Sequence, residues 1–416
     1  MKAPSQTVSN VGQPSRKAAL YGLALVTLLN FVNYADRFIL AAVLPRIKTD
    51  LDLTDVELGL LANAFLIAFF LTSPVFGRLG DRGSRPRLLA AGVGLWSLMT
   101  AGAGLARNFV QLATARAAVG VGEAAYSTIS PALLADYFPV ECRGRVFARF
   151  YVAVPVGAAG GFLLGGVLEQ LFGWRRAFYA VGLPGLALAL LVLTVPDPPR
   201  GATEGRLDDK PLGTIEALRE LRGNFTYVGT VLGYAAYTFG LGGLAVWMPT
   251  YLERVRGLQL QDADLLVGAV TAVSGLTGTF IGGYLGDRLS RRLRQGHLWL
   301  SGGATVAAIL PAWLALTAVS PMIFRPSLFV AEFFLFLSTG PVNVVIVSIV
   351  PPGIRAMAMA VCIFVIHALG DAISPPIIGM LADFNGLARA VLIVPISIAV
   401  AGIFWTATAA REMLRS

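Results

Sequence analysis

The sequence predicts an all-α integral membrane protein with twelve transmembrane helices in two pseudo-symmetric six-helix bundles. Hydrophobic residues make up 56% of the 416 residues and charged residues only 14%, with a mean hydropathy of +0.70. Soluble domains carry about 25% charged residues, so lipid is the expected surrounding of most side chains. A second observation is a repeat: the segment Gly77–Arg87, GRLGDRGSRPR, returns as Gly283–Leu293, GYLGDRLSRRL. A repeat about half a chain apart indicates two related halves.

Apolar runs long enough to cross a bilayer give the expected helices in chain order. They cover 19–45, 56–77, 87–106, 109–137, 145–170, 175–195, 225–252, 264–286, 297–318, 322–350, 356–381 and 388–410. The longest polar interruption, 196–222, begins with Pro and Gly and ends in a short expected surface helix from Thr214 to Leu221. We therefore predict an N-terminal bundle at 1–195, a linker at 196–224 and a C-terminal bundle at 225–416.

The distribution of Lys and Arg predicts the orientation in the membrane. With both termini on one side, 22 of the 33 basic residues fall on that side, and nine fall on the other. Cytoplasmic loops are enriched in Lys and Arg, so we expect both termini in the cytoplasm. The net charge of +9 is explained by these loops, and we do not expect a nucleic-acid partner.

Four charged residues lie well inside two of the apolar runs of the N-terminal half, far from their ends. Asp36 and Arg37 lie in the first run, and Arg116 and Glu123 lie seven residues apart in the fourth, on one helix face. Charges inside a bilayer are costly and usually functional. One interpretation is an anion held by the cations while a carboxylate takes a proton, and the other is an ion-pair network that only joins the two helices.

Two long runs of the C-terminal half are rich in aromatic residues. The run 225–252 has no charged residue before position 253 but contains Tyr234 and Tyr237, and the run 322–350 contains Phe333. Each aromatic side chain could equally well pack against neighbouring helices or face lipid. A charged half opposite an apolar half would suit an amphiphilic ligand.

The sequence contains no motif typical of metal binding, nucleotide binding or hydrolysis. The two cysteines, Cys142 and Cys362, have no spacing that suggests a disulfide framework or a metal site. Phosphate-binding loops, zinc-ligand spacings and hydrolase nucleophile motifs are not found in the sequence. We expect no cofactor, no metal and no enzymatic activity, and we expect a monomer.

The repeated pattern G-x-L-G-D-R-x-S-R resembles the loop between the second and third helices in each half of the major facilitator superfamily. The segments NYADRF at 33–38, VGVGEAAYSTISPALLADYFP at 119–139 and RGRVFARFYVAVPVGAAGG at 143–161 resemble the spinster family. The resemblance implies a proton-linked exporter of lysolipids such as lysophospholipids or sphingosine phosphates. It also implies that Asp81 meets the start of the eleventh helix and an Arg after the fourth helix, Arg143 or Arg145.

These arguments assign roles to individual residues. We assign substrate binding to Arg37, Arg116, Tyr34, Tyr234, Tyr237 and Phe333, and proton coupling to Glu123 and Asp36. We assign gating to Gly77, Asp81, Arg82, Arg85, Arg143, Arg145, Asp287 and Arg288.

The expected function is export of amphiphilic anionic lipids across the inner (plasma) membrane by alternating access, driven by protons. The expected partners are the lipid substrate, protons and the surrounding membrane lipids. One alternative is a transporter of small organic anions or drugs that uses the same charged residues. Another is a membrane receptor that does not transport.

Overall fold

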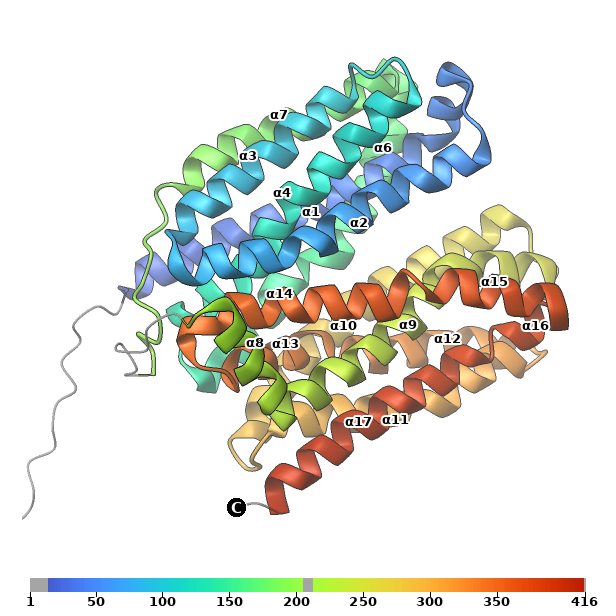
Figure 1. Ribbon diagram of the computed structural model, residues 1–416. Helices are drawn as coiled ribbons and strands as arrows, with labels where there is room; N and C mark the ends of the chain where they lie inside the picture. The colour runs from blue at the N-terminus through green and yellow to red at the C-terminus, as the bar shows by residue number, and fades with distance from the viewer. Residues whose placement is uncertain (1–13, 205–211, 415–416) are drawn as a thin grey trace, which may run out of the picture.

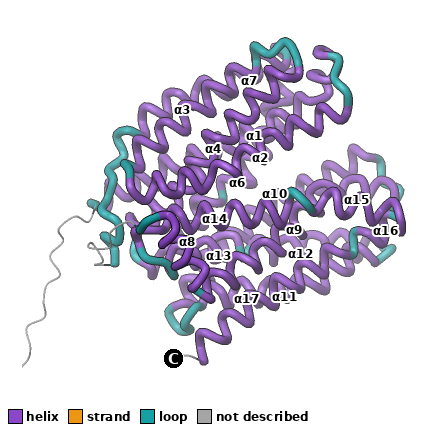
Figure 2. The backbone as a smooth tube through the Cα atoms, in the orientation of Figure 1, coloured by secondary structure: helices purple, strands orange, loops and turns teal. Residues whose placement is uncertain are grey.

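The structure is a computed structural model that describes residues 14–204 and 212–414, and this part of the chain folds into helices and loops without a strand (Figure 2). The N-terminal helices are α1 (Arg16–Leu51), α2 (Asp55–Arg82), α3 (Arg85–Ala103), α4 (Phe109–Tyr137), α5 (Arg143–Tyr151), α6 (Ala153–Phe172) and α7 (Trp174–Val192). After α8 (Thr214–Gly223) follow α9 (Phe225–Arg254), α10 (Leu260–Ser290), α11 (Gly296–Thr317), α12 (Pro321–Phe336), α13 (Thr339–Ser348), α14 (Arg355–Ile366), α15 (Ser374–Asn385), α16 (Leu387–Ala390) and α17 (Ile393–Leu414). Short helical turns η1 (Val140–Cys142) and η2 (Pro352–Ile354) precede α5 and α14, and a π-helical turn, η3 (His367–Asp371), follows α14.

The helices account for the twelve expected spans. Ten helical segments of the described chain are long and apolar enough to cross a membrane, and α3 and α4 supply the remaining two. Three spans contain breaks that the sequence analysis did not place: between α5 and α6, between α12 and α13, and at η3. Each break precedes a proline (Pro155, Pro341 and Pro375) by three to five residues. A proline ring clashes with the carbonyl four residues earlier, which explains these positions.

The helices form two bundles that pack against each other from one end to about the middle of the spans. Figure 1 shows α1 to α7 and α9 to α17 as two groups whose ribbons meet beside α8 and spread apart toward the opposite end. We call the end with α8 and residues 196–204 the linker face, and the opposite end the far face. The start of α1 and the end of α17 also lie at the linker face, where Tyr21 bonds to Thr194 (2.7 Å) and Thr226 to Glu412 (2.6 Å). Between the bundles, α2 packs on α14 and α5 on α10.

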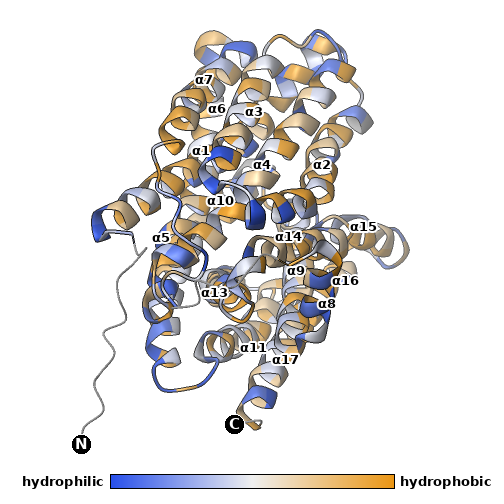
Figure 3. Cartoon of the chain, turned by 60° about the vertical axis from the view of Figure 1, so that its left-hand side comes forward, coloured by the Kyte–Doolittle hydropathy of each residue, from blue (hydrophilic) through white to orange (hydrophobic). Residues whose placement is uncertain are grey.

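The outer surface of the spanning helices is apolar (Figure 3). Leu163, Leu190 and Leu265 are 70%, 70% and 71% exposed, while Asp36 and Glu123 are 1% and 0% exposed. A soluble protein would bury such leucines and expose such carboxylates. This inversion agrees with a lipid surrounding and concentrates the polar chemistry in the interior.

The predicted surface helix is present as α8, two residues longer than expected. Its Ala217 and Leu221 are buried, whereas Ile215 is 74% exposed. The sequence therefore located this helix correctly.

Candidate functional site

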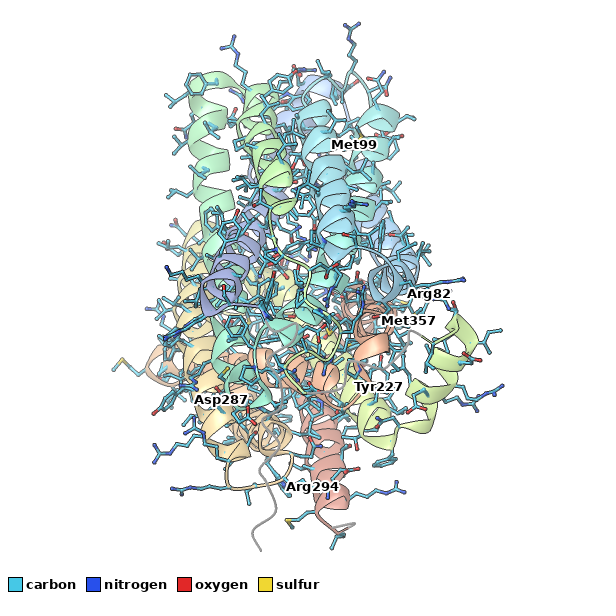
Figure 4. All side chains as sticks on the ribbon, turned by 90° about the vertical axis from the view of Figure 1, so that its left-hand side faces the viewer. Arg82, Met99, Tyr227, Asp287, Arg294 and Met357 are labelled. Carbon is cyan, nitrogen blue, oxygen red and sulfur yellow. The ribbon has the colours of Figure 1, made fainter. Side chains whose placement is uncertain are left out.

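The two aspartates of the repeated motif join the bundles at the linker face. The carboxylate of Asp81 accepts hydrogen bonds from the backbone N–H groups of Ala356 (2.8 Å) and Met357 (2.9 Å) at the start of α14. The carboxylate of Asp287 accepts from Gly144 (2.7 Å) and from the next N–H group (3.0 Å) at the start of α5. Each aspartate thus caps a helix of the other bundle, where the helix dipole favours a negative charge. Figure 4 looks onto this face and labels Asp287 and Met357.

Glycines allow this close approach. A Cβ atom at Gly77 would lie 2.6 Å from the Cβ of Ala360 and 2.9 Å from the Cα of Met357 on α14. A Cβ atom at Gly144 would lie 2.4 Å from an Asp287 oxygen and 2.5 Å from the Gly283 carbonyl oxygen. Larger residues at Gly77 or Gly144 would therefore force the bundles apart in this conformation.

The predicted pairing of Asp81 with Arg143 or Arg145 is wrong. Arg145 forms its ion pair with Asp287 instead (2.9 Å), and Arg143 pairs with Glu204 (2.5 Å). The reason is that Asp81 and Asp287 cap different helices, and the arginines after α4 lie beside the cap that Asp287 makes. Among the described residues, Asp81 accepts hydrogen bonds only from these two backbone N–H groups.

A second set of ion pairs lies behind these caps. Arg85 donates to Asp136 at the end of α4 (2.5 Å) and to Asp197 at the start of the linker (2.7 Å). Asp136 also accepts from Arg355 of the C-terminal bundle (2.6 Å). Arg85 and Arg355 are 1% exposed and Asp136 is 0% exposed, so the two ion pairs of Asp136 are shielded from salt and water, whereas Asp197 is exposed.

Glu204 completes this arrangement from within the linker. Its carboxylate accepts from Arg143 of the N-terminal bundle (2.5 Å) and from Arg355 of the C-terminal bundle. We call Glu204, Arg143 and Arg355 the linker clamp. Partial burial acts to raise the pKa of Glu204, but attraction by Arg355 and Arg143 outweighs it, so the pKa is lowered from its ordinary value. Glu204 therefore remains ionised at neutral pH.

Sequence reasoning assigned Arg143 to gating but missed the other two clamp residues, Glu204 and Arg355, as well as Asp136. Arg355 had one detectable signal, since Pro351 and Arg355 repeat the spacing of Pro139 and Arg143 about half a chain earlier. Glu204 carried no signal because nothing in a linker sequence shows which arginine it meets. The other predicted gating residues, Arg82 and Arg288, are exposed and form no ion pair with a described residue.

The four charged residues of the first and fourth spans form a buried group, which we call the central cluster: Asp36, Arg37, Arg116 and Glu123. Arg37 donates from Nε to Glu123 (2.6 Å), which is fully buried. Asp36, 1% exposed, accepts from the Thr100 hydroxyl (2.5 Å). The cluster therefore joins α1 to α4 and α1 to α3.

Arg116 differs from the other members of the cluster. It is 3% exposed, and its Nε and Nη1 atoms have no hydrogen-bond partner among the described residues. One oxygen each of Asp36 and Glu123 is likewise unpartnered there. Buried polar groups without partners are costly, and native proteins keep few of them without a functional reason. Arg116 therefore keeps buried guanidinium donors without a partner among the described residues.

Aromatic rings border the cluster. The Arg37 guanidinium lies 4.9 Å from the ring centres of Tyr34, Phe65 and Phe69, and that of Arg116 lies 5.0 Å from Phe65. These distances permit cation–π attraction. The Phe69 ring in turn meets His367 of η3 edge-on at 5.3 Å. The cluster therefore adjoins the C-terminal bundle.

The predicted aromatic residues of the C-terminal half lie in two different settings. Tyr234 and Phe333 are half-buried, and Phe333 stacks with Phe329 at 6.4 Å. Tyr237 is 3% exposed, and its hydroxyl donates to the Leu335 carbonyl (2.9 Å). Tyr237 therefore packs α9 against α12 in this conformation, while Tyr234 and Phe333 remain accessible in part. No cluster of metal-ligating side chains occurs in the described residues.

Comparison with known proteins places this chain in a family. The profile of the Major Facilitator Superfamily matches residues 26–366. Protein spinster homolog 1 of Bos taurus is 36% identical over 389 residues, which cover 87% of this chain and 72% of that protein. The Homo sapiens protein of the same name is 35% identical over 398 residues, covering 89% and 74%.

Solved structures agree with these relationships. A bacterial homolog to the human lysosomal transporter spinster, in an inward-facing and unoccupied conformation, matches with a TM-score of 0.62 at 26% identity, covering 96% of this chain and 97% of that one. The transporter FucP in its outward conformation matches with a TM-score of 0.75 at 17% identity, covering 94% and 99%. The match to the bacterial spinster homolog extends to sequence as well as fold, whereas the match to FucP concerns the fold alone. This chain belongs to the spinster family of the major facilitator superfamily, whose members are membrane transporters and not enzymes.

Proposed function

We propose that this transporter exports amphiphilic anionic lipids, of the lysophospholipid or sphingosine-phosphate type, by proton-coupled alternating access. The observation that carries the proposal is Arg116, a buried guanidinium with unpartnered donors beside the Arg37–Glu123 ion pair. A phosphate group offers several anionic oxygens to such donors through charge-assisted hydrogen bonds. The head group would bind between Arg116 and Arg37.

Proton coupling follows from competition for Arg37. Glu123 is fully buried, and its charge is compensated by Arg37 at 2.6 Å. A head group that draws Arg37 away leaves a buried carboxylate without its cation, which favours protonation of Glu123. Proton and anion therefore promote each other's binding at the cluster, and this linkage is reciprocal. Asp36 is the second candidate for protonation, because one of its oxygens is also unpartnered among the described residues.

The apolar tail would extend from the cluster toward the C-terminal bundle. Tyr34 lies beside Arg37 on the cluster side, and Tyr234 and Phe333 are half-buried on the opposite side. Aromatic rings bury a large apolar area and adapt to chains of different length. A charged cluster opposite aromatic side chains supports an amphiphile over a small hydrophilic anion.

The linker face is the proposed cytoplasmic side, in the inner membrane. The basic loops support this orientation by the positive-inside rule. In that orientation the bundles are closed toward the cytoplasm, and the structure represents an outward-facing state. Asp81, Asp287, Gly77, Arg85, Arg143 and Arg145 would then act in cytoplasmic gating, because all of them hold contacts at or near the closed face.

Flux in proteoliposomes with an imposed pH gradient tests the proposal. The wild-type protein should move lysophospholipids or sphingosine phosphates faster than short carboxylates, and flux should respond to the gradient. Glu123→Gln mimics the protonated acid, so it should still bind lipid but lose the response to the gradient. A Glu123→Gln protein that kept the wild-type response would refute the role of Glu123 and leave Asp36. Faster flux of short anions than of lipids would favour the organic-anion alternative, and no flux of any kind would favour a receptor.

A further inference from the structure

A basic groove opens on the outside of the N-terminal bundle at the linker face, apart from the central cluster. It runs between the end of α2 and the start of α3, with Thr214 of α8 at its border, and has a volume of about 840 Å³. Its lining combines apolar side chains with three arginines, Arg78, Arg82 and Arg87. We call it the arginine groove.

The three arginines are available to a ligand. All three are exposed, and none forms an ion pair with an acidic side chain of the described residues. Arg82 donates one hydrogen bond, to the Leu212 carbonyl oxygen (2.9 Å), which ties the start of α8 to the groove. Figure 4 shows Arg82 at the edge of the molecule. The Thr214 hydroxyl oxygen is buried and has no hydrogen-bond partner among the described residues. The groove therefore offers cationic donors and a hydroxyl group at one place.

The same groove continues into a lipid-facing apolar surface. Val75 and Leu79, which line it, are 57% and 43% exposed, and Leu71, one turn further along α2, is 55% exposed. On the other side, α8 presents Ile215 and Leu218, 74% and 43% exposed, among charged residues. A helix of this kind lies in the plane of the membrane interface. Cations thus sit at head-group depth with acyl-chain surface directly beside them.

We propose that the arginine groove binds an anionic diacyl phospholipid from the leaflet next to the linker face. The phosphate would lie among Arg78, Arg82 and Arg87, and the acyl chains along Leu71 and Val75 of α2. Basic pockets at the ends of transmembrane helices are suited to anionic head groups. Such a lipid would be a resident of the membrane and not the transported substrate.

The second copy of the motif does not form an equal site. Its groove is smaller, about 250 Å³, and contains Asp287 along with Arg145, Arg288, Arg291 and Arg292. Asp287 already neutralises Arg145, at 2.9 Å. The repeat therefore supplies basic residues at both places, but within the described residues only the N-terminal copy places three arginines without an acidic partner beside α8.

Native mass spectrometry of the purified protein with dioleoyl-phosphatidylglycerol tests the proposal. The wild-type protein should retain one phosphatidylglycerol more tightly than dioleoyl-phosphatidylcholine. The triple variant Arg78→Gln, Arg82→Gln and Arg87→Gln should bind it about tenfold more weakly or worse, because each cation near the surface contributes to the attraction. Glycerol phosphate, which carries the anion without acyl chains, should not displace the lipid.

Two control variants keep the result interpretable. Replacing Arg107, Arg176 and Arg254 with Gln removes the same charge from exposed positions at the far face and should leave binding unchanged. Arg116→Gln alters the central cluster and should also leave it unchanged. Equal loss in the far-face variant would show that only net charge matters, and loss confined to Arg116→Gln would place the lipid in the transport site. Displacement by glycerol phosphate would identify an anion site. Each of these three results overturns the proposal.

Discussion

Replacing Glu204 with Gln should open the linker face. The carboxylate of Glu204 connects Arg143 and Arg355, one from each bundle, and its side chain is 16% exposed. Gln has nearly the same shape, so the substitution removes the charge and leaves the packing. Both arginines keep other partners: Arg143 donates to the Ala135 carbonyl (2.6 Å) and Arg355 to Asp136 (2.6 Å). The loss is therefore smaller than that of an isolated buried ion pair.

The magnitude follows from the two charge-assisted hydrogen bonds. Each contributes about 1.5–3 kcal/mol, and the Gln oxygen retains part of one of them, so we expect a loss of about 2 kcal/mol. This corresponds to about a thirtyfold change in the ratio of closed to open molecules. A population that is closed in about 99 of 100 molecules would become closed in about three of four. A change of this size is measurable.

Distances between spin labels report the change. Labels at Arg87 and Arg292, one in each bundle at the linker face, can be attached after Cys142 and Cys362 are replaced. Double electron–electron resonance should show a longer-distance population in Glu204→Gln. Glu220→Gln serves as the control, because Glu220 is an exposed acid of α8 that forms no ion pair with a described residue. Unchanged distances in Glu204→Gln, or equal changes in both variants, would refute the clamp.

The effect of pH gives a second check with a defined sign. The pKa of Glu204 is lowered in the closed state from its ordinary value of 4.5. Its contribution to closure is therefore complete at neutral pH and is lost only as the pH falls through this lowered pKa. The effect of Glu204→Gln should be the same at about pH 6 and about pH 8. A difference between these two values would assign the opening to another group.

Three further substitutions test the gate and the site. Gly77→Ala introduces a Cβ atom 2.6 Å from the Cβ of Ala360. This clash should shift the equilibrium of the labelled protein toward the open linker face by about 1–3 kcal/mol. Unchanged distances would argue against tight packing of α2 on α14. Asp81→Asn removes the negative charge and one of the two acceptor oxygens that cap α14, which weakens the cap by about 1 kcal/mol. The same distances should lengthen, whereas unaltered populations would remove Asp81 from the gate. Arg116→Ala should weaken lipid binding in a direct titration by about tenfold or more. Its thermal unfolding midpoint should stay within the range of the other two variants in this paragraph. Full affinity for lipid would exclude Arg116 from the site.

The sequence predicted a structural feature correctly where that feature depends on a single local pattern. The apolar runs located the spans, because a bilayer fixes their length regardless of which neighbours they pack against. The contact of Asp81 with the start of the eleventh span is present, and its counterpart at Asp287 follows from the repeat. The seven-residue spacing placed Arg116 and Glu123 on one face of α4, and both are buried there.

Ion-pair partners that depend on tertiary packing could not be predicted from the sequence in the same way. The spacing on α4 could not show that Glu123 pairs with Arg37, which lies 86 residues earlier on α1. Nor could it show that Arg143 and Arg145, two residues apart, turn to Glu204 and Asp287. Successive residues of a helix point in different directions, and the packing of the bundles decides what each one meets. A family resemblance gave the correct neighbourhood but the wrong partner for both arginines.

The central cluster and the closed face are joined by α4. The coupling that the proposed transport cycle requires between them is explained better by movement of this helix than by direct electrostatic interaction. Glu123 and Asp136 both belong to α4, thirteen residues apart, which is about 20 Å along the axis. Two unit charges at that distance interact by only about 0.8 kcal/mol at an effective dielectric constant of about 20. Arg85 and Arg355 further neutralise Asp136, at 2.5 and 2.6 Å. The direct field is thus weaker than the loss of about 2 kcal/mol expected for the clamp. The effect of a rigid-body tilt of α4 does not fall with distance in this way. A rearrangement around Glu123 that tilts α4 also displaces Asp136 and strains its contact with Arg355.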